Sequence, residues 1–175
     1  MVYNFLRGGA GINVLAKHVG AEVIVVDMGV KEKILATGGK NFKDKKINFG
    51  TKNFAKEQAM SIEDVHKSLL GGIEVFEEAH SERVIDIVGV GDMGIGNTTA
   101  SSAIVAAVTG EDVALVTGRG TGIDDASYLH KIEVIKKALS LHNPDPKDPI
   151  DVLSKVGGFE IAGIAGVILA AASKR

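Results

Sequence analysis

The sequence predicts an α/β protein with a doubly wound, mostly parallel sheet that is incomplete in this chain. Val23–Val26 is a continuous β-branched run, which is typical of a strand covered on both faces, and the apolar run Val84–Val88, which contains Asp86, predicts a second buried strand. Helical patterns alternate with these runs, as helices do when they connect parallel strands. Two strands are too few for a complete sheet, so we expect further strands to be missing from it.

The first helices are recognised by their periodicity and by their start signals. Asn4–Val19 places small residues on one side and larger apolar residues on another, which predicts one helix. Ser61–Asp64 has the pattern of a capping box, and the helix that it begins carries an apolar stripe as far as Phe76. A run of small residues predicts a third helix from about Thr98 to Val108.

Three more helices follow in the C-terminal part. Asp124–Leu141 is predicted to be helical, and three prolines then interrupt the helical pattern. A short helix over Ile150–Val156 ends at a glycine pair, and Phe159–Ala172 predicts a last, very apolar helix. The segment Val113–Val116 is too short to assign. The expected buried face of the helix 124–141 consists of Leu129, Ile132, Ile135 and Leu139.

Composition limits the classes of protein that need to be considered. The 175 residues suit one domain with a real core, and the net charge of −2 predicts no general affinity for nucleic acid. The absence of cysteine excludes disulfides, thiolate catalysis and cysteine-ligated zinc. No signal peptide is visible, and the longest uncharged apolar segment, 161–172, is too short for a bilayer. A soluble, cytoplasmic protein with no membrane partner is therefore expected.

One segment is rich in lysine. Lys31–Lys56 holds eight lysines and two acidic residues. A nucleic-acid patch is one interpretation, but the segment lacks arginine and a regular interleaving of aromatic residues. A solvated, mobile excursion from the fold is the favoured interpretation.

The most informative segment is a glycine-rich loop, Gly89–Thr99, between the predicted strand 84–88 and the predicted helix. This arrangement presents backbone N–H groups to an anion, and its four glycines let the main chain approach a phosphate. The polar side chains of Asn97, Thr98 and Thr99 can cap the helix or bind phosphate oxygens. The alternative is a turn that only connects strand to helix.

Other chemistry-bearing patterns are absent. The five histidines show no metal-ligand spacing, the serines lack a nucleophile elbow, and no P-loop lysine follows the glycine loop. The spacing of Gly89, Gly91 and Gly94 fits a dinucleotide fingerprint, but no acidic residue ends a following strand at the required distance. We therefore expect neither a metal nor a cofactor.

Four colinear segments resemble one enzyme family. Gly91–Thr99 is similar to the G-E-M-G-I-G-N-T-T loop of the nicotinate-nucleotide:dimethylbenzimidazole phosphoribosyltransferases. Gly118–Asp124 with the later Lys131 resembles the second glycine loop of that family and its helix lysine. The remaining matches are Asp148–Leu153 with Val156–Gly163, and Gly9–Asn13 with Val25–Val30.

The resemblance implies a fold and a reaction. The family has a Rossmann-like α/β domain and works as a homodimer. It transfers 5-phosphoribose from nicotinate mononucleotide to 5,6-dimethylbenzimidazole, giving α-ribazole 5′-phosphate and nicotinate in the assembly of the cobalamin lower ligand. Such a site needs a phosphate cradle, stabilisation of positive charge at C1′ and a base for the benzimidazole proton.

The resemblance also implies roles for individual residues. The 5′-phosphate is expected to meet donors from Gly94, Ile95, Gly96 and Asn97, with Thr98 at the helix start and Lys131 as a cationic contact. Gly120 and Gly122 are expected to let the second loop lie against the pyridine or ribose. Asp92 stands where the family has glutamate, and a supporting catalytic role is expected for it. Outside the resemblance, Lys131 has the pattern of an exposed helix lysine and Asp92 that of a turn residue.

Family chains are longer than this one. Residues 1–175 are expected to be the central part of the α/β phosphoribosyltransferase domain, with no separate second domain and with the main catalytic base outside the chain. The alternative to an enzyme is therefore a truncated, inactive nucleotide-binding or structural remnant. The isolated chain is expected to be an oligomer with negligible transfer activity, unless Asp92 or Asp27 acts as the base.

Overall fold

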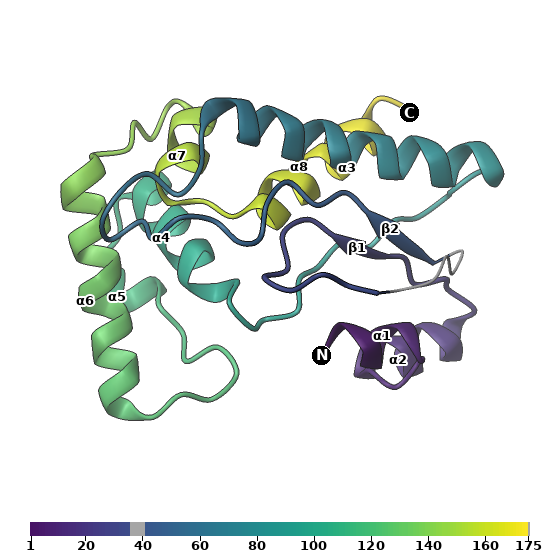
Figure 1. Ribbon diagram of the computed structural model, residues 1–175, viewed down its shortest axis with the longest axis horizontal. Coiled ribbons are helices and arrows are strands. Elements are labelled where there is room, and N and C mark those ends of the chain that lie inside the picture. Colours follow the sequence, from purple (N-terminus) through teal and green to yellow (C-terminus); the bar gives the residue numbers. More distant parts are fainter. Residues whose placement is uncertain (36–40, 175) are drawn as a thin grey trace. The chain divides into compact units, whose positions relative to one another are not determined.

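The computed structural model describes residues 1–35 and 41–174, which form an α/β fold with a small parallel sheet and many helices (Figure 1). The predicted α/β class is confirmed. Two units are distinguished by their internal contacts, Met1–Gly50 and Thr51–Arg175. The expectation of one continuous domain over 1–175 stays a prediction.

The first unit begins with two short helices, α1 (Val2–Leu6) and α2 (Gly11–Val19). The prediction of a single helix over 4–19 is wrong. Gly8 adopts φ +78°, a left-handed conformation that glycine tolerates best, and the N–H of Gly9 bonds back to the carbonyl of Asn4. This local turn ends α1 and redirects the chain into α2.

Two strands complete the first unit. β1 (Val25–Asp27) and β2 (Phe42–Asp44) are parallel, with Val25 opposite Phe42. β1 lies close to the predicted strand 23–26. The prediction of a solvated excursion over 31–56 is wrong where β2 lies, and residues 36–40 are outside the described part of the chain.

One lysine of this segment has a structural partner. Lys46 Nζ lies 2.7 Å from the buried Asp27 carboxylate, whose other oxygen accepts the N–H groups of Gly29 and Val30. Asp27 is therefore a structural carboxylate at the end of β1, with one oxygen in an ion pair and the other in two backbone hydrogen bonds. That environment does not favour the role of substitute base that the sequence left open for it.

The second unit is helical. Its helices are α3 (Ile62–Glu82), α4 (Thr98–Thr109), α5 (Val113–Val116), α6 (Asp125–His142), α7 (Pro149–Val156) and α8 (Phe159–Ala172). α4, α6, α7 and α8 agree with the predictions to within one residue, α3 begins where predicted and extends to Glu82, and α5 forms over a segment that the sequence left unassigned. The capping box of α3 is formed: Ser61 Oγ accepts the N–H of Asp64, and the Asp64 carboxylate accepts the N–H of Ser61. At α6 and α7 the cap is a single side chain: Asp124 accepts the N–H of Ser127, and Asp148 accepts the N–H of Ile150.

The predicted strand over 84–88 is wrong. This segment is an irregular connection between α3 and α4, with 71% of Val84 and 91% of Ile87 exposed. A parallel strand needs hydrogen-bonded neighbours and covered faces, and no strand in the described part of the chain pairs with this segment. Its apolar composition alone cannot supply either.

The core of the second unit positions the site. Small and branched side chains from four helices fill it, with α6 beside α4 and α5 (Figure 1). Leu129, predicted to be buried, is 60% exposed, whereas Lys131 is buried on the core side of α6. The core consists of Ala103, Ala106, Val113, Ile132, Ile135, Ala138, Val152 and Val156.

α3 and α8 run side by side (Figure 1). A Cβ atom on Gly72 would overlap the carbonyl of Gly163, and one on Gly166 would overlap the carbonyl of Leu69. Glycine at these helical positions therefore permits the two backbones to touch. This contact packs α8 against the long α3.

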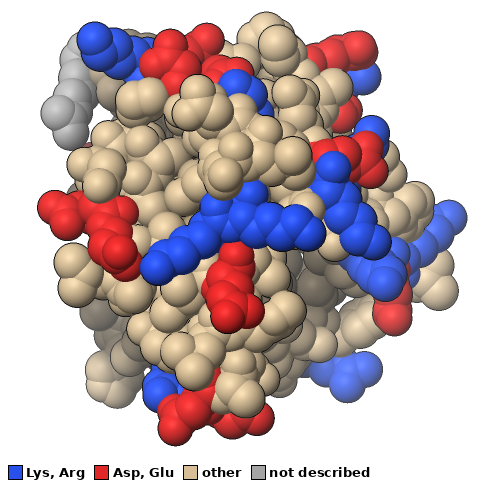
Figure 2. All heavy atoms as spheres, turned by 90° about the vertical axis from the view of Figure 1, so that its left-hand side faces the viewer, with Lys and Arg blue, Asp and Glu red and all other residues tan. Residues whose placement is uncertain are grey.

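On the face that α6 occupies, lysine and arginine side chains are interspersed with acidic ones (Figure 2). Such a mixture is typical of a solvated surface. Among the helices described here, none combines the length and the apolar character needed to cross a membrane.

Candidate functional site

The first glycine loop leads directly into α4. Gly94 and Gly96 adopt φ +74° and +80°, conformations that side chains rarely tolerate. α4 begins at Thr98, and the first N–H groups of a helix have no carbonyl partner within it. The loop therefore ends at a helix start whose N–H groups and dipole favour an anion. Ile95 lies exposed in this loop.

The second glycine loop, 118–124, precedes α6. Gly120 and Gly122 adopt φ +59° and +98°. Arg119 folds over the loop, donating to the carbonyl of Ile123 and pairing with the Asp125 carboxylate. These contacts close the loop on itself.

Lys131 joins the two loops. Its Nζ donates to Thr98 Oγ1 at 2.8 Å and to the carbonyl of Gly118 at 2.9 Å. Next to this contact, a Cβ on Gly120 would lie only 2.8 Å from Thr98 Oγ1. The structure thus brings together three residues that are far apart in the sequence, Thr98, Gly120 and Lys131.

The environment of Lys131 is unusual for a lysine. The residue is only 9% exposed, and burial lowers the pKa of its ammonium group from the ordinary 10.5. No carboxylate in the described ranges, 1–35 and 41–174, pairs with it. A buried ammonium group is costly unless an opposite charge and hydrogen bonds compensate it. Two neutral acceptors compensate only part of that cost, and the third N–H of the ammonium group has no acceptor among the described residues.

Asp92 makes a turn within the first loop. Its Oδ1 accepts the N–H of Gly94 at 2.7 Å, and the residue is exposed. This bond shapes the approach to Gly94, as the turn interpretation expects. The supporting catalytic role of Asp92 stays a prediction.

Asn97 differs from the simplest expectation for a residue at a helix start. Its side chain does not cap α4. Instead, Nδ2 donates to Glu160 Oε1 at 2.9 Å, and Oδ1 is buried with no partner among the described residues. One N–H of the amide is therefore already used, and direct donation from Asn97 to a phosphate stays a prediction.

Sequence reasoning missed Glu160. The residue lies in the segment 156–163 that carried one of the family matches, but nothing in its local pattern linked it to Asn97, 63 positions earlier. Its place in the first turn of α8 was the available signal, since carboxylates there are stabilised by the helix dipole.

Two glycines of the second loop give a matched test of this geometry. Gly120→Ala introduces a Cβ at 2.8 Å from Thr98 Oγ1 and requires a left-handed backbone, whereas Gly118→Ala meets nothing closer than 4.0 Å. We expect Gly120→Ala to weaken binding of inorganic phosphate about tenfold, by displacing Thr98 from Lys131. Gly118→Ala should change the affinity for phosphate by less than about twofold, because no neighbouring atom has to move. Calorimetric titration measures both, and equal affinities in the two variants would contradict the proposed loop contact.

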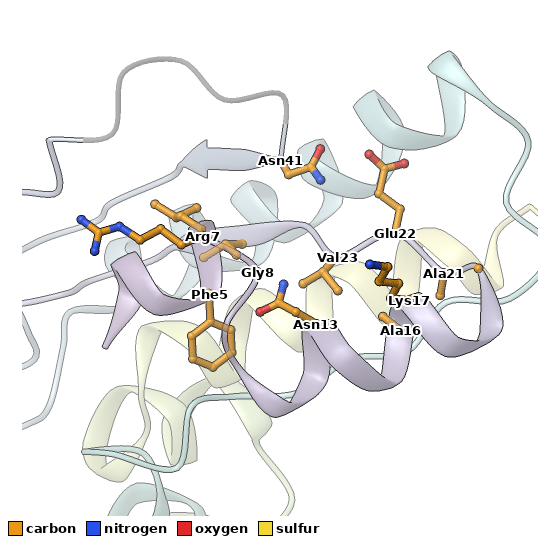
Figure 3. Close-up of a pocket in the computed structure, with 13 residues that line it drawn as sticks. Phe5, Arg7, Gly8, Asn13, Ala16, Lys17, Ala21, Glu22, Val23 and Asn41 are labelled. Carbon is orange, nitrogen blue, oxygen red and sulfur yellow. The ribbon is translucent and has the colours of Figure 1, made fainter.

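A separate pocket of about 700 Å³ lies in the first unit, and Figure 3 shows Asn13, Ala16 and Lys17 rising from α2 along it. Asn13 is already used, because its Oδ1 accepts the N–H of Ala10. None of the predicted site residues lines this pocket. Across the described residues, no group of three histidine, aspartate or glutamate side chains could hold a metal ion.

Comparisons with known proteins agree with the resemblance. Residues 1–175 match a family described as phosphoribosyltransferase. A relative from Roseiflexus castenholzii is 56% identical and one from Desulforudis audaxviator 57% identical, each over the whole chain and 49% of the relative. Both are named nicotinate-nucleotide–dimethylbenzimidazole phosphoribosyltransferase. The chain thus spans about half the length of the curated relatives that it matches.

Solved structures show the same similarity. CobT from Thermus thermophilus superposes with a TM-score of 0.91 and 37% identity, over 99% of this chain and 51% of that one. A second structure from that organism, of the nicotinate-nucleotide-dimethylbenzimidazole phosphoribosyltransferase, gives a TM-score of 0.87 and 35% identity, over 99% of this chain and 50% of the other. The partial Rossmann-like fold expected from the sequence agrees with these neighbours.

Proposed function

Because the chain belongs to the nicotinate-nucleotide:dimethylbenzimidazole phosphoribosyltransferase family, we propose that it acts in the transfer of 5-phosphoribose from nicotinate mononucleotide to 5,6-dimethylbenzimidazole. The products are α-ribazole 5′-phosphate and nicotinate. The single observation that supports a phosphate-bearing substrate is Lys131, a buried ammonium group between two glycine loops that has no carboxylate partner in the described part of the chain. A phosphate beside it supplies the missing charge.

The proposed reaction exchanges one ring nitrogen for another at C1′. The bond between C1′ and the pyridinium nitrogen breaks, and its electron pair leaves with nicotinate. A benzimidazole nitrogen attacks C1′, and a base removes the proton from the other nitrogen of that ring. The nicotinate ring needs no added proton to leave, because the electron pair of the broken bond neutralises the positive charge on its ring nitrogen.

The site residues are assigned to parts of the nucleotide. We propose that the backbone of the first loop and Lys131 hold the 5′-phosphate, and that the second loop lies against the ribose or pyridine. Asp92 is proposed to shape the first loop and to stand near the ribose. The phosphate contacts are Gly94, Ile95, Gly96, Asn97, Thr98 and Lys131, and the second-loop contacts are Gly120 and Gly122.

Titration calorimetry with nicotinate mononucleotide tests binding, and an assay for α-ribazole 5′-phosphate after addition of dimethylbenzimidazole tests transfer. Binding with turnover supports the proposed enzyme. Binding without turnover favours the second candidate, a nucleotide-binding remnant. No binding of the nucleotide, in a chain that circular dichroism shows to be folded, contradicts both and leaves a purely structural remnant.

The buried state of Lys131 gives a pH dependence. Its ammonium form predominates below its pKa, which burial lowers from 10.5. Affinity for nicotinate mononucleotide should therefore be retained near neutral pH and should fall as the pH rises through that lowered value, before an ordinary lysine would lose its charge. Calorimetry from about pH 7 to about pH 10 measures this fall. The profile should be flat in Lys131→Met, and a fall of the same size in that variant would assign it to another group.

We also propose a homodimer and a cytoplasmic location. The exposed apolar side chains of Val84 and Ile87, in the connection before the first glycine loop, support association with a second copy. Light scattering of the purified chain tests the oligomeric state, and a monodisperse monomer would contradict it.

A further inference from the structure

The contact between Glu160 and Asn97 joins α8 to the start of α4. Glu160 Oε1 accepts the N–H of Asn97 Nδ2 at 2.9 Å, and both side chains are partly buried. Because a carboxylate only accepts hydrogen bonds, this partner fixes which end of the Asn97 amide carries the nitrogen. The orientation of Asn97 is therefore set from α8 and not from within its own loop.

The sequence before Glu160 allows this contact. Gly158 precedes α8, and a Cβ there would lie 2.7 Å from both carboxylate oxygens of Glu160. Glycine thus leaves room for the carboxylate to fold back over the start of α8. The dipole of that helix also favours a negative charge in its first turn.

We propose that Glu160 is a positioning residue for the nucleotide: it holds Asn97, and through it the 94–98 loop, in the conformation that receives the phosphate. This inference rests on the proposed function. Glu160 is not itself a phosphate ligand, because a carboxylate and a phosphate are both acceptors and repel each other. Its effect passes through Asn97, which directly precedes the Thr98 that Lys131 binds.

Three variants separate positioning from charge. Glu160→Ala removes the acceptor, Glu160→Gln keeps an acceptor oxygen without the charge, and Glu133→Gln is a control on the exposed face of α6. We expect Glu160→Ala to raise the Kd for nicotinate mononucleotide about tenfold, the loss expected for a hydrogen bond to a charged group. The Kd of Glu160→Gln should stay within about threefold of that of the original chain, and the Kd of Glu133→Gln should not differ from it.

Hydrogen exchange of the free protein gives a readout that needs no nucleotide. Glu160→Ala should speed exchange of the backbone amides at 96–101 about tenfold, because the start of α4 loses its tether. If the original chain does not bind nicotinate mononucleotide, the proposed function fails, while the exchange rates still test the tether. If Glu160→Ala leaves these rates unchanged, the inference is wrong whatever the ligand.

The double variant tests whether Glu160 acts through Asn97. Asn97→Ala with Glu160→Ala should bind the nucleotide no more weakly than Asn97→Ala alone. Additive losses would overturn the inference, and so would equal losses in Glu160→Ala and Glu160→Gln. If Glu160→Ala does not fold, Asn97→Ala removes the same hydrogen bond by deleting its donor. The hydrogen-exchange rates at 96–101 are then compared between Asn97→Ala and the original chain.

Discussion

Gly72→Ala is expected to lower the free energy of unfolding by about 3 kcal/mol, although the same substitution inside a helix is normally stabilising. The added Cβ would overlap the carbonyl of Gly163 on the facing helix, and that atom is backbone, which cannot rotate away. α3 and α8 must separate to admit it, and the buried contacts between them are then lost. Urea unfolding followed by circular dichroism measures the change.

Gly11→Ala is the matched control for this prediction. Gly11 is also helical, but a Cβ there meets nothing within 4 Å. The control should be neutral or stabilising by at most about 1 kcal/mol, since alanine favours the helix. An equally small effect of Gly72→Ala would mean that α3 and α8 do not touch at their glycines.

The helices of the second unit could be predicted because their signals are local. The caps of α3, α6 and α7 join residues only two or three positions apart. They are formed by Ser61 with Asp64, by Asp124 and by Asp148. The strand assigned to 84–88 failed for the opposite reason. Strand formation depends on partners elsewhere in the fold, and an apolar run does not reveal whether such partners are present.

The site was predictable in the same uneven way. The loop glycines could be found because positive φ values at Gly94, Gly96 and Gly120 require that residue type. The burial of Lys131 was missed because a charged side chain normally favours solvent, although position 131 lies on the same helical face as the buried Ile135 and Ala138. The tether from Glu160 to Asn97 joins residues 63 positions apart, and no local pattern marks it.

Lys131→Met is expected to weaken the binding of nicotinate mononucleotide by about 1.5–3 kcal/mol, the range for a lost charge-assisted hydrogen bond. Methionine keeps an unbranched apolar stem in the buried position and removes the ammonium group, so the core side of α6 stays filled. Thr98 and the carbonyl of Gly118 lose their donor, but the Thr98 hydroxyl can rotate to another partner.

The decisive comparison for Lys131→Met is with nicotinate riboside, which has the same ring and sugar without the phosphate. Its affinity should be unchanged if Lys131 contacts the phosphate, and Lys136→Met on the exposed face of α6 should alter neither ligand. Calorimetric titration of both ligands against the three proteins measures these differences. Equal losses for the two ligands would show that Lys131 only holds the loops together. A loss of affinity confined to the phosphate-bearing ligand would identify the phosphate of the nucleotide as the negative charge that pairs with the buried ammonium group.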